Sequence, residues 1–116
     1  MSQRSNQVAE ELRKIISQIF LEDLADERLG FVTITRVEIT EDLRFARVYY
    51  SVLGGEAEKE STREAVEEQA PYLRRLAVER INMKYAMEFK FELDRSIDEG
   101  FRIDEIFKKL KKKGNP

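Results

Sequence analysis

The residues of this chain that could take part in catalysis are few, because its 116 residues include neither cysteine nor histidine. This composition excludes a thiolate nucleophile and a disulfide framework, and it removes the usual zinc ligands and the commonest general base. Catalysis would have to rest on carboxylates, Ser61 or Lys84, and none of these stands beside a recognisable partner. The acidic pairs Glu22-Asp23 and Asp26-Glu27 lack any other metal-ligand type nearby, so we interpret them as solvated loop residues. We therefore expect no enzyme activity, no metal and no cofactor.

Basic residues form the second chemical group, and their chemistry is the binding of phosphates. Four of them follow Pro71 in a predicted helical segment: Arg74, Arg75, Arg80 and Lys84. Arg80 and Lys84 are one helical turn apart and share a face, whereas the spacing allows Arg75 to turn away from it. Such a face could contact RNA, or it could simply be solvated, and the residues alone leave both interpretations open.

Charge is distributed unevenly along the chain, whose net charge is −2. Residues 101–116 contain six basic and two acidic residues, so they carry +4 and the remaining chain carries −6. The overall charge therefore gives no argument for a nucleic-acid partner, and only local clusters of basic residues could give one. The basic end could grip phosphates nonspecifically or could serve only solubility; its candidate contacts are Lys108, Lys109, Lys111 and Lys112. No secretory segment or membrane span is visible in the sequence, so we expect a soluble cytoplasmic protein.

A predicted β-hairpin is the first element that must position these residues. Its strands, Gly30–Ile39 and Arg44–Gly54, are rich in β-branched and aromatic residues and flank the polar turn Thr40–Leu43. The period of two gives the second strand one face of Ala46, Val48, Tyr50 and Val52, and an opposite face of Phe45, Arg47, Tyr49 and Ser51. In the first strand either face could be the inner one.

Two hairpin residues, Arg44 and Arg47, are further candidate RNA contacts. Arg47 shares its face with Phe45 and Tyr49, which we take as the open face of the sheet, with Ala46, Val48, Tyr50 and Val52 on the inner one. Aromatic rings beside a cation suit base stacking. The alternative is that the C-terminal helix covers these aromatic rings.

Amphipathic helices should cover the hairpin. The first has one apolar stripe and Ser5 or Asn6 as its cap; the stripe is Val8, Leu12, Ile15, Ile16, Ile19 and Phe20. A second begins at the capping box Ser61-Thr62-Arg63-Glu64 and meets Pro71, which cannot donate a helical hydrogen bond. The apolar pattern resumes at Leu73, so we predict two short helices or one sharply kinked helix, broken at Gln69-Ala70-Pro71.

The remaining elements complete an α+β fold. A third strand, Met87–Leu93, alternates apolar and charged residues, and a short amphipathic helix follows within residues 101–116. The predicted order is α-β-β-α-(kink)-α-β with that C-terminal helix, and it gives a three-stranded mixed sheet with helices on one face. We expect one folded domain over residues 1–100 and a separate helix with a lysine-rich tail over residues 101–116.

In this order of elements and in several motifs the chain resembles bacterial ribosome-binding factor A, a family with the type II KH topology. The most specific match is Val32–Leu43, and weaker ones are Asp26–Gly30, Tyr72–Leu76 and Glu88–Asp94. KH domains normally carry a Gly-x-x-Gly loop, which no spacing of the five glycines here provides. In this family an Ala-x-Gly kink replaces that loop, and here Pro71 follows Ala70 and stands at the glycine position.

The resemblance implies a KH-like RNA-binding domain over residues 1–100, in a monomeric assembly factor without catalytic activity. Such proteins bind the free or immature small (30S) ribosomal subunit, assist late 16S rRNA maturation and processing, and are often linked to growth in the cold. It implies no membrane and no small-molecule substrate, and it favours RNA contacts on the helix after the kink. The residues alone leave open an alternative, a protein–protein adaptor that uses the open sheet face or its edge.

Overall fold

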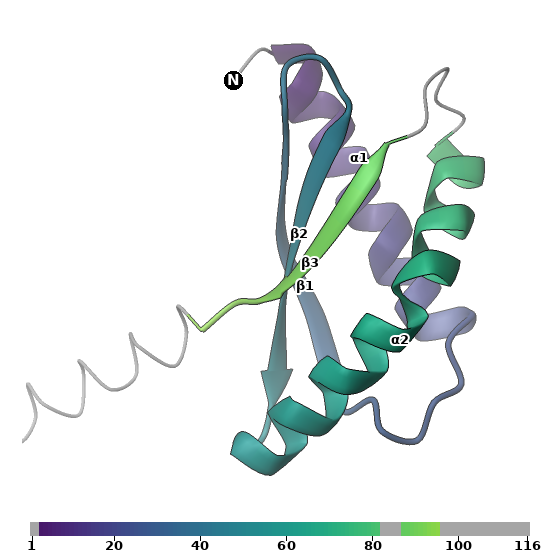
Figure 1. Ribbon diagram of the computed structural model, residues 1–116. Helices are drawn as coiled ribbons and strands as arrows, with labels where there is room; N and C mark the ends of the chain where they lie inside the picture. The colour runs from purple at the N-terminus through teal and green to yellow at the C-terminus, as the bar shows by residue number, and fades with distance from the viewer. Residues whose placement is uncertain (1–2, 82–86, 96–116) are drawn as a thin grey trace, which may run out of the picture.

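Two helices pack on one face of a three-stranded sheet in the computed structural model, which describes residues 3–81 and 87–95 (Figure 1). The elements are α1 (Gln3–Glu22), β1 (Phe31–Ile39), β2 (Phe45–Leu53), α2 (Glu56–Ile81) and β3 (Glu88–Leu93). The sheet order is β1-β2-β3, with β1 antiparallel and β3 parallel to β2. The predicted α+β class and mixed sheet are confirmed. The predicted C-terminal helix, Lys84 and the lysines of the tail lie outside the described residues.

The helix α1 carries the predicted apolar stripe. Ala9, Leu12, Ile16 and Ile19 are buried along one side and face β1 and α2. The helix begins at Gln3, so the prediction of Ser5 or Asn6 as its cap was wrong. The residues before Val8 are polar and give no apolar period, which is why the start was predicted too late. No helix among the described residues combines the length and the apolar character needed to cross a membrane.

A β-bulge in β1 decides which of its faces is the inner one. Ile34 pairs with Tyr50 and Arg36 with Tyr49, so Thr35 is the extra residue. The extra residue reverses the alternation, and both Ile34 and Val37 therefore point into the core. In β2 the predicted inner face is confirmed, since its four residues are all buried: Ala46, Val48, Tyr50 and Val52.

The helix α2 is continuous and contains Pro71, and Figure 1 shows it changing direction near its middle. Of the two predicted forms, the kinked single helix is the one observed. A proline inside a helix removes one hydrogen bond and crowds the carbonyl four residues back, which bends the axis. The C-terminal part of α2 follows this bend.

The start of α2 differs from the prediction. The helix begins at Glu56, where the Gly55 amide donates to a carboxylate oxygen of Glu58 at 2.9 Å. Glu58 is thus the acidic half of a capping box that lies earlier than the predicted one. The predicted box at residues 61–64 was wrong, because Thr62 is buried inside the helix and binds the loop before β1 instead. Its Oγ1 accepts from the Gly30 amide at 3.1 Å and donates to the Arg28 carbonyl at 3.2 Å.

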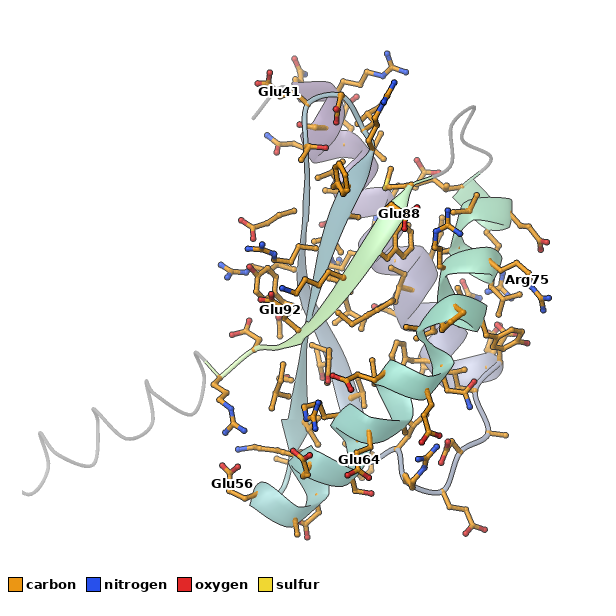
Figure 2. All side chains as sticks on the ribbon, in the orientation of Figure 1. Glu41, Glu56, Glu64, Arg75, Glu88 and Glu92 are labelled. Atoms are coloured by element: carbon orange, nitrogen blue, oxygen red, sulfur yellow. The ribbon has the colours of Figure 1, made fainter. Side chains whose placement is uncertain are left out.

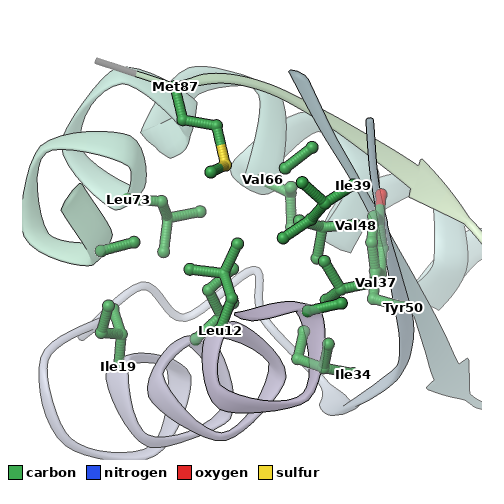
Figure 3. Close-up of a cluster of buried hydrophobic side chains, with 14 of the residues drawn as sticks. Leu12, Ile19, Ile34, Val37, Ile39, Val48, Tyr50, Val66, Leu73 and Met87 are labelled. Carbon is green, nitrogen blue, oxygen red and sulfur yellow. The ribbon is translucent and has the colours of Figure 1, made fainter. Parts of the chain in front are cut away.

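The hydrophobic core lies between the sheet and the two helices (Figure 3). Side chains from every described element meet there, including Leu12 of α1, Val48 of β2 and Leu73 of α2, all fully buried. Met87 closes the core where β3 begins. The opposite face of the sheet has no helix against it within the described residues.

Candidate nucleic-acid interface

The predicted basic cluster on α2 is divided by the structure into structural and accessible residues. Nε of Arg74 donates to the Met87 carbonyl at 2.7 Å, and its Nη2 lies 3.6 Å from a Glu88 carboxylate oxygen. Arg74 therefore fastens α2 to the start of β3. Nη2 of Arg80 lies 2.6 Å from Asp23 Oδ2 and joins the C-terminal ends of the two helices.

Arg75 is the accessible arginine of this group. Its side chain is exposed and projects away from the sheet (Figure 2), and among the described residues it has no carboxylate partner. Its guanidinium carbon lies 5.2 Å from the ring centroid of Tyr72, which is 37% exposed. Tyr72 directly follows Pro71, so an aromatic ring and a free cation stand side by side at the bend. A nucleic-acid backbone that approaches the bend would meet both.

The distribution of charge along α2 restricts a phosphate-binding surface to the second half of the helix. Six glutamates lie between Glu56 and Glu68, against Lys59 and Arg63 only. After Pro71 the helix has three arginines and one glutamate, Glu79. Phosphates are repelled by the first half and attracted by the second.

Of the two hairpin cations, Arg47 lies on the open face of the sheet and Arg44 lies beside the turn. Arg44 is exposed beside the turn, where its backbone N–H donates to Asp42 Oδ1 at 3.2 Å. Arg47 lies beside Tyr49, whose hydroxyl accepts from Arg47 Nη1 at 3.4 Å. Its Nε is 3.7 Å from a Glu92 carboxylate oxygen, which also lies 3.2 Å from Lys90 Nζ. The hydrogen bond to Tyr49, with the charge of Glu92, raises the pKa of Arg47.

Two candidate contact residues, Arg36 on the sheet and Tyr72 on α2, were not among the residues predicted from the sequence. The guanidinium carbon of Arg36 lies 4.0 Å from the ring centroid of Tyr49, which places a cation over the aromatic face. Only the bulge at Thr35 turns Arg36 to this side, and nothing in the local sequence marks a bulge. Tyr72 was also missed, although its position directly after Pro71 was the signal that could have found it.

Two of the residues considered for catalysis, Ser61 and Asp26, have structural partners. Ser61 Oγ donates to the Arg28 carbonyl at 3.4 Å, and Asp26 accepts from Arg28 Nη2 at 2.7 Å. The Arg28 side chain and its backbone amide hold the pKa of Asp26 well below its usual range. In residues 3–81 and 87–95 no three acidic side chains gather as a metal site would require.

This fold and surface define a class: an α+β domain of type II KH topology with a proline-bent helix and an accessible cation, Arg75, beside the bend. The model of the family "Ribosome-binding factor A" matches residues 4–107, and the chain belongs to that family.

Named relatives support this membership. Ribosome-binding factor A of Caldanaerobacter subterraneus subsp. tengcongensis is 46% identical over 97% of this chain and 93% of the relative. The crystal structure of ribosome-binding factor A from Thermus thermophilus is similar in fold, with a TM-score of 0.67 and 20% identity over 79% of this chain and 98% of that one. Coordinates of the Thermus thermophilus factor fitted into a cryo-EM map of a 30S complex match with a TM-score of 0.65 and 20% identity, over 78% of this chain and 96% of that one.

Proposed function

We propose that this protein is a ribosome assembly factor that binds the free or immature small ribosomal subunit and assists late 16S rRNA maturation. The observation that carries the proposal is family membership over residues 4–107, in a family named for binding the ribosome. The Thermus relative, whose fold is similar, has been placed in a complex with the 30S subunit. A protein that binds ribosomal subunits works in the cytoplasm, and we expect this one there.

The surface beside the bend of α2 supports contact with rRNA. Arg75 and Tyr72 offer a cation and an exposed ring, and within residues 3–81 and 87–95 neither holds the fold together by an ion pair. We propose that Arg75 contacts a phosphate there, and that Arg74 and Arg80 chiefly keep the helix in position. Binding of this kind needs no catalytic group, and we propose that the protein acts by binding alone.

Sedimentation with ribosomal particles tests this function. We expect the protein to move with free small subunits and not with whole ribosomes on a density gradient. Repeating the binding at increasing salt should weaken it, because each phosphate contact releases counterions. Equal binding to whole ribosomes, or none to small subunits, would refute the proposal. Affinity that does not change with salt, or no binding to rRNA stripped of protein, would favour a protein–protein adaptor.

A further inference from the structure

The open face of the sheet carries a hollow of about 610 Å³ near the hairpin turn. Its floor is the paired row Ile39–Ala46–Phe89. Because the side chains of Ile39 and Ala46 are buried in the core, these two residues present their backbone to the hollow. A hollow of this volume can hold one planar ring system of a ligand together with part of the backbone that carries the ring.

An aromatic wall borders this hollow. Phe45 lies next to the floor and is 58% exposed, an unfavourable arrangement for a large apolar side chain in water. The ring points to the face that no described helix covers. A flat apolar partner would stack on it and remove it from solvent.

The side of the hollow that lies further from the hairpin turn is cationic. Arg47 and Lys90 are register partners on β2 and β3, and both line the hollow. Their ion pairs both go to Glu92, so one carboxylate serves two cations and a phosphate could take its place on either. Arg47 and Lys90 lie two residues further along their strands than Phe45 and its register partner Glu88, so the hollow suits a ligand with a ring at one end and a phosphate at the other.

Carboxylates at the rim add a hydrogen-bonding preference. Glu38 is the register partner of Arg47 and lines the hollow beside it. A carboxylate only accepts hydrogen bonds, so it favours bases with an exocyclic amine over uracil, whose single N3–H donor is flanked by two carbonyl oxygens that the carboxylate repels. Glu88, on the other side, is the residue that Arg74 of α2 reaches across the start of β3. The hollow thus begins where the second half of α2 meets the sheet.

We propose that this hollow binds one unstacked, amine-bearing base of single-stranded RNA, with the ring on Phe45 and the adjoining phosphate on Arg47 and Lys90. This deepens the proposed function and rests on it for the biological source of the RNA. It gives the protein two RNA-binding surfaces, one beside the bend of α2 and one on the other layer of the fold. A single strand could reach both by passing the start of β3.

Binding of short oligonucleotides to the full chain tests the proposal. The probes are fluorescein-labelled single-stranded RNA hexamers of adenosine and of uridine, measured by anisotropy. We expect the adenosine hexamer to bind more tightly, and Phe45→Ala to weaken its binding about 5- to 150-fold, as loss of a stacking ring does. Phe45→Tyr keeps a ring and should keep the affinity.

Phe31→Ala is the matched control. Phe31 lies on the same sheet, is 80% exposed and does not line the hollow. Its removal should leave hexamer binding unchanged. Equal losses from Phe31→Ala and Phe45→Ala, or no preference between the hexamers together with unchanged binding by Phe45→Ala, would overturn the proposal. Thermal unfolding of each variant shows that the fold is retained.

The same variants on small subunits separate this proposal from the proposed function. If the unaltered protein binds no small subunits, the proposed function fails, whatever the hexamers show. If it binds them and Phe45→Ala leaves hexamer affinity unchanged, the hollow is not an RNA site and the function stands. If Phe45→Ala weakens subunit binding but not hexamer binding, the hollow takes a ribosomal protein, which also overturns the RNA assignment.

Discussion

Adjacent arginines on α2 should respond to substitution in opposite ways. Arg74 holds the Met87 carbonyl, whereas Arg75 stands free of carboxylates in the described structure and lies beside the exposed Tyr72. We expect Arg74→Ala to reduce stability with little direct effect on RNA binding. We expect Arg75→Ala to reduce RNA binding with little effect on stability. Each variant is the control for the other, because the chemical change is the same.

The size of the stability loss follows from the contact of Arg74. Removing its side chain leaves the carbonyl of Met87, a residue that is 1% exposed, without this donor. Hydrogen bonds from charged donors contribute about 1.5–3 kcal/mol, and the half-exposed position of Arg74 favours the lower end of that range. A loss of about 1.5 kcal/mol in a domain of this size lowers Tm by roughly 5 °C.

The size of the binding effect follows from counterion release. A lost phosphate contact should reduce the slope of log affinity against log salt by about 0.7 for single-stranded RNA, and the free energy of unfolding should stay within about 0.5 kcal/mol. Thermal unfolding and a salt series on small subunits measure both quantities for both variants. If Arg75→Ala lowers Tm as much as Arg74→Ala and leaves the salt slope intact, the assignment of roles is refuted.

Three further predictions concern the fold around the site. Thr62→Val should destabilise by about 2 kcal/mol in chemical denaturation, since it leaves the Gly30 N–H without its acceptor and removes the shorter of the two hydroxyl contacts to the Arg28 carbonyl; an unchanged midpoint would mean that other contacts hold the loop. The pKa of Asp26 is held below its ordinary 3.8, so its stabilisation is fully present well above that value and is lost as pH falls through and below it; Asp26→Asn should flatten the stability profile between about pH 5 and pH 2, and parallel profiles would contradict this. Leu43 is buried at a φ of 60°, so Leu43→Ala should cost about 2–3 kcal/mol by denaturation, and Leu43→Gly less because it also relieves about 1 kcal/mol of left-handed strain; the reverse order would show that strain is negligible.

The alternation of apolar and polar residues was sufficient to predict the inner face of β2, but it was insufficient to predict the inner face of β1. In β2 the inner residues keep an unbroken period of two from Ala46 to Val52, and all are buried. In β1 the spacing from Ile34 to Val37 is three, which a regular strand cannot place on one face. The bulge that makes it work depends on pairing with β2, and pairing is a property of two strands. The position of Arg36 over Tyr49 was therefore beyond a one-strand prediction.

The capping box shows a local motif overruled by tertiary contacts. Ser61 to Glu64 has the composition of a helix start, yet the helix begins at Glu56. The hydroxyl of Thr62 has better partners in the loop before β1, more than thirty residues earlier in the sequence. A local motif of four residues contains no information about partners so distant in sequence, so it could not show that Thr62 would bind the loop and not cap the helix.

Partners that are distant in sequence also explain why the basic residues of α2 could be identified as candidates but could not be divided into structural and accessible ones. Asp23, which pairs with Arg80, lies 57 residues away from it, and composition alone makes Arg74 and Arg75 equivalent. Once the partners are known, the acidic first half of α2 and the paired Arg74 and Arg80 both support our proposal that phosphates bind at the bend beside Pro71. Helix packing leaves the sheet face with Phe45 and Arg47 open on the other layer. A protein of net charge −2 can therefore bind RNA, because its acidic and basic residues lie on different parts of its surface.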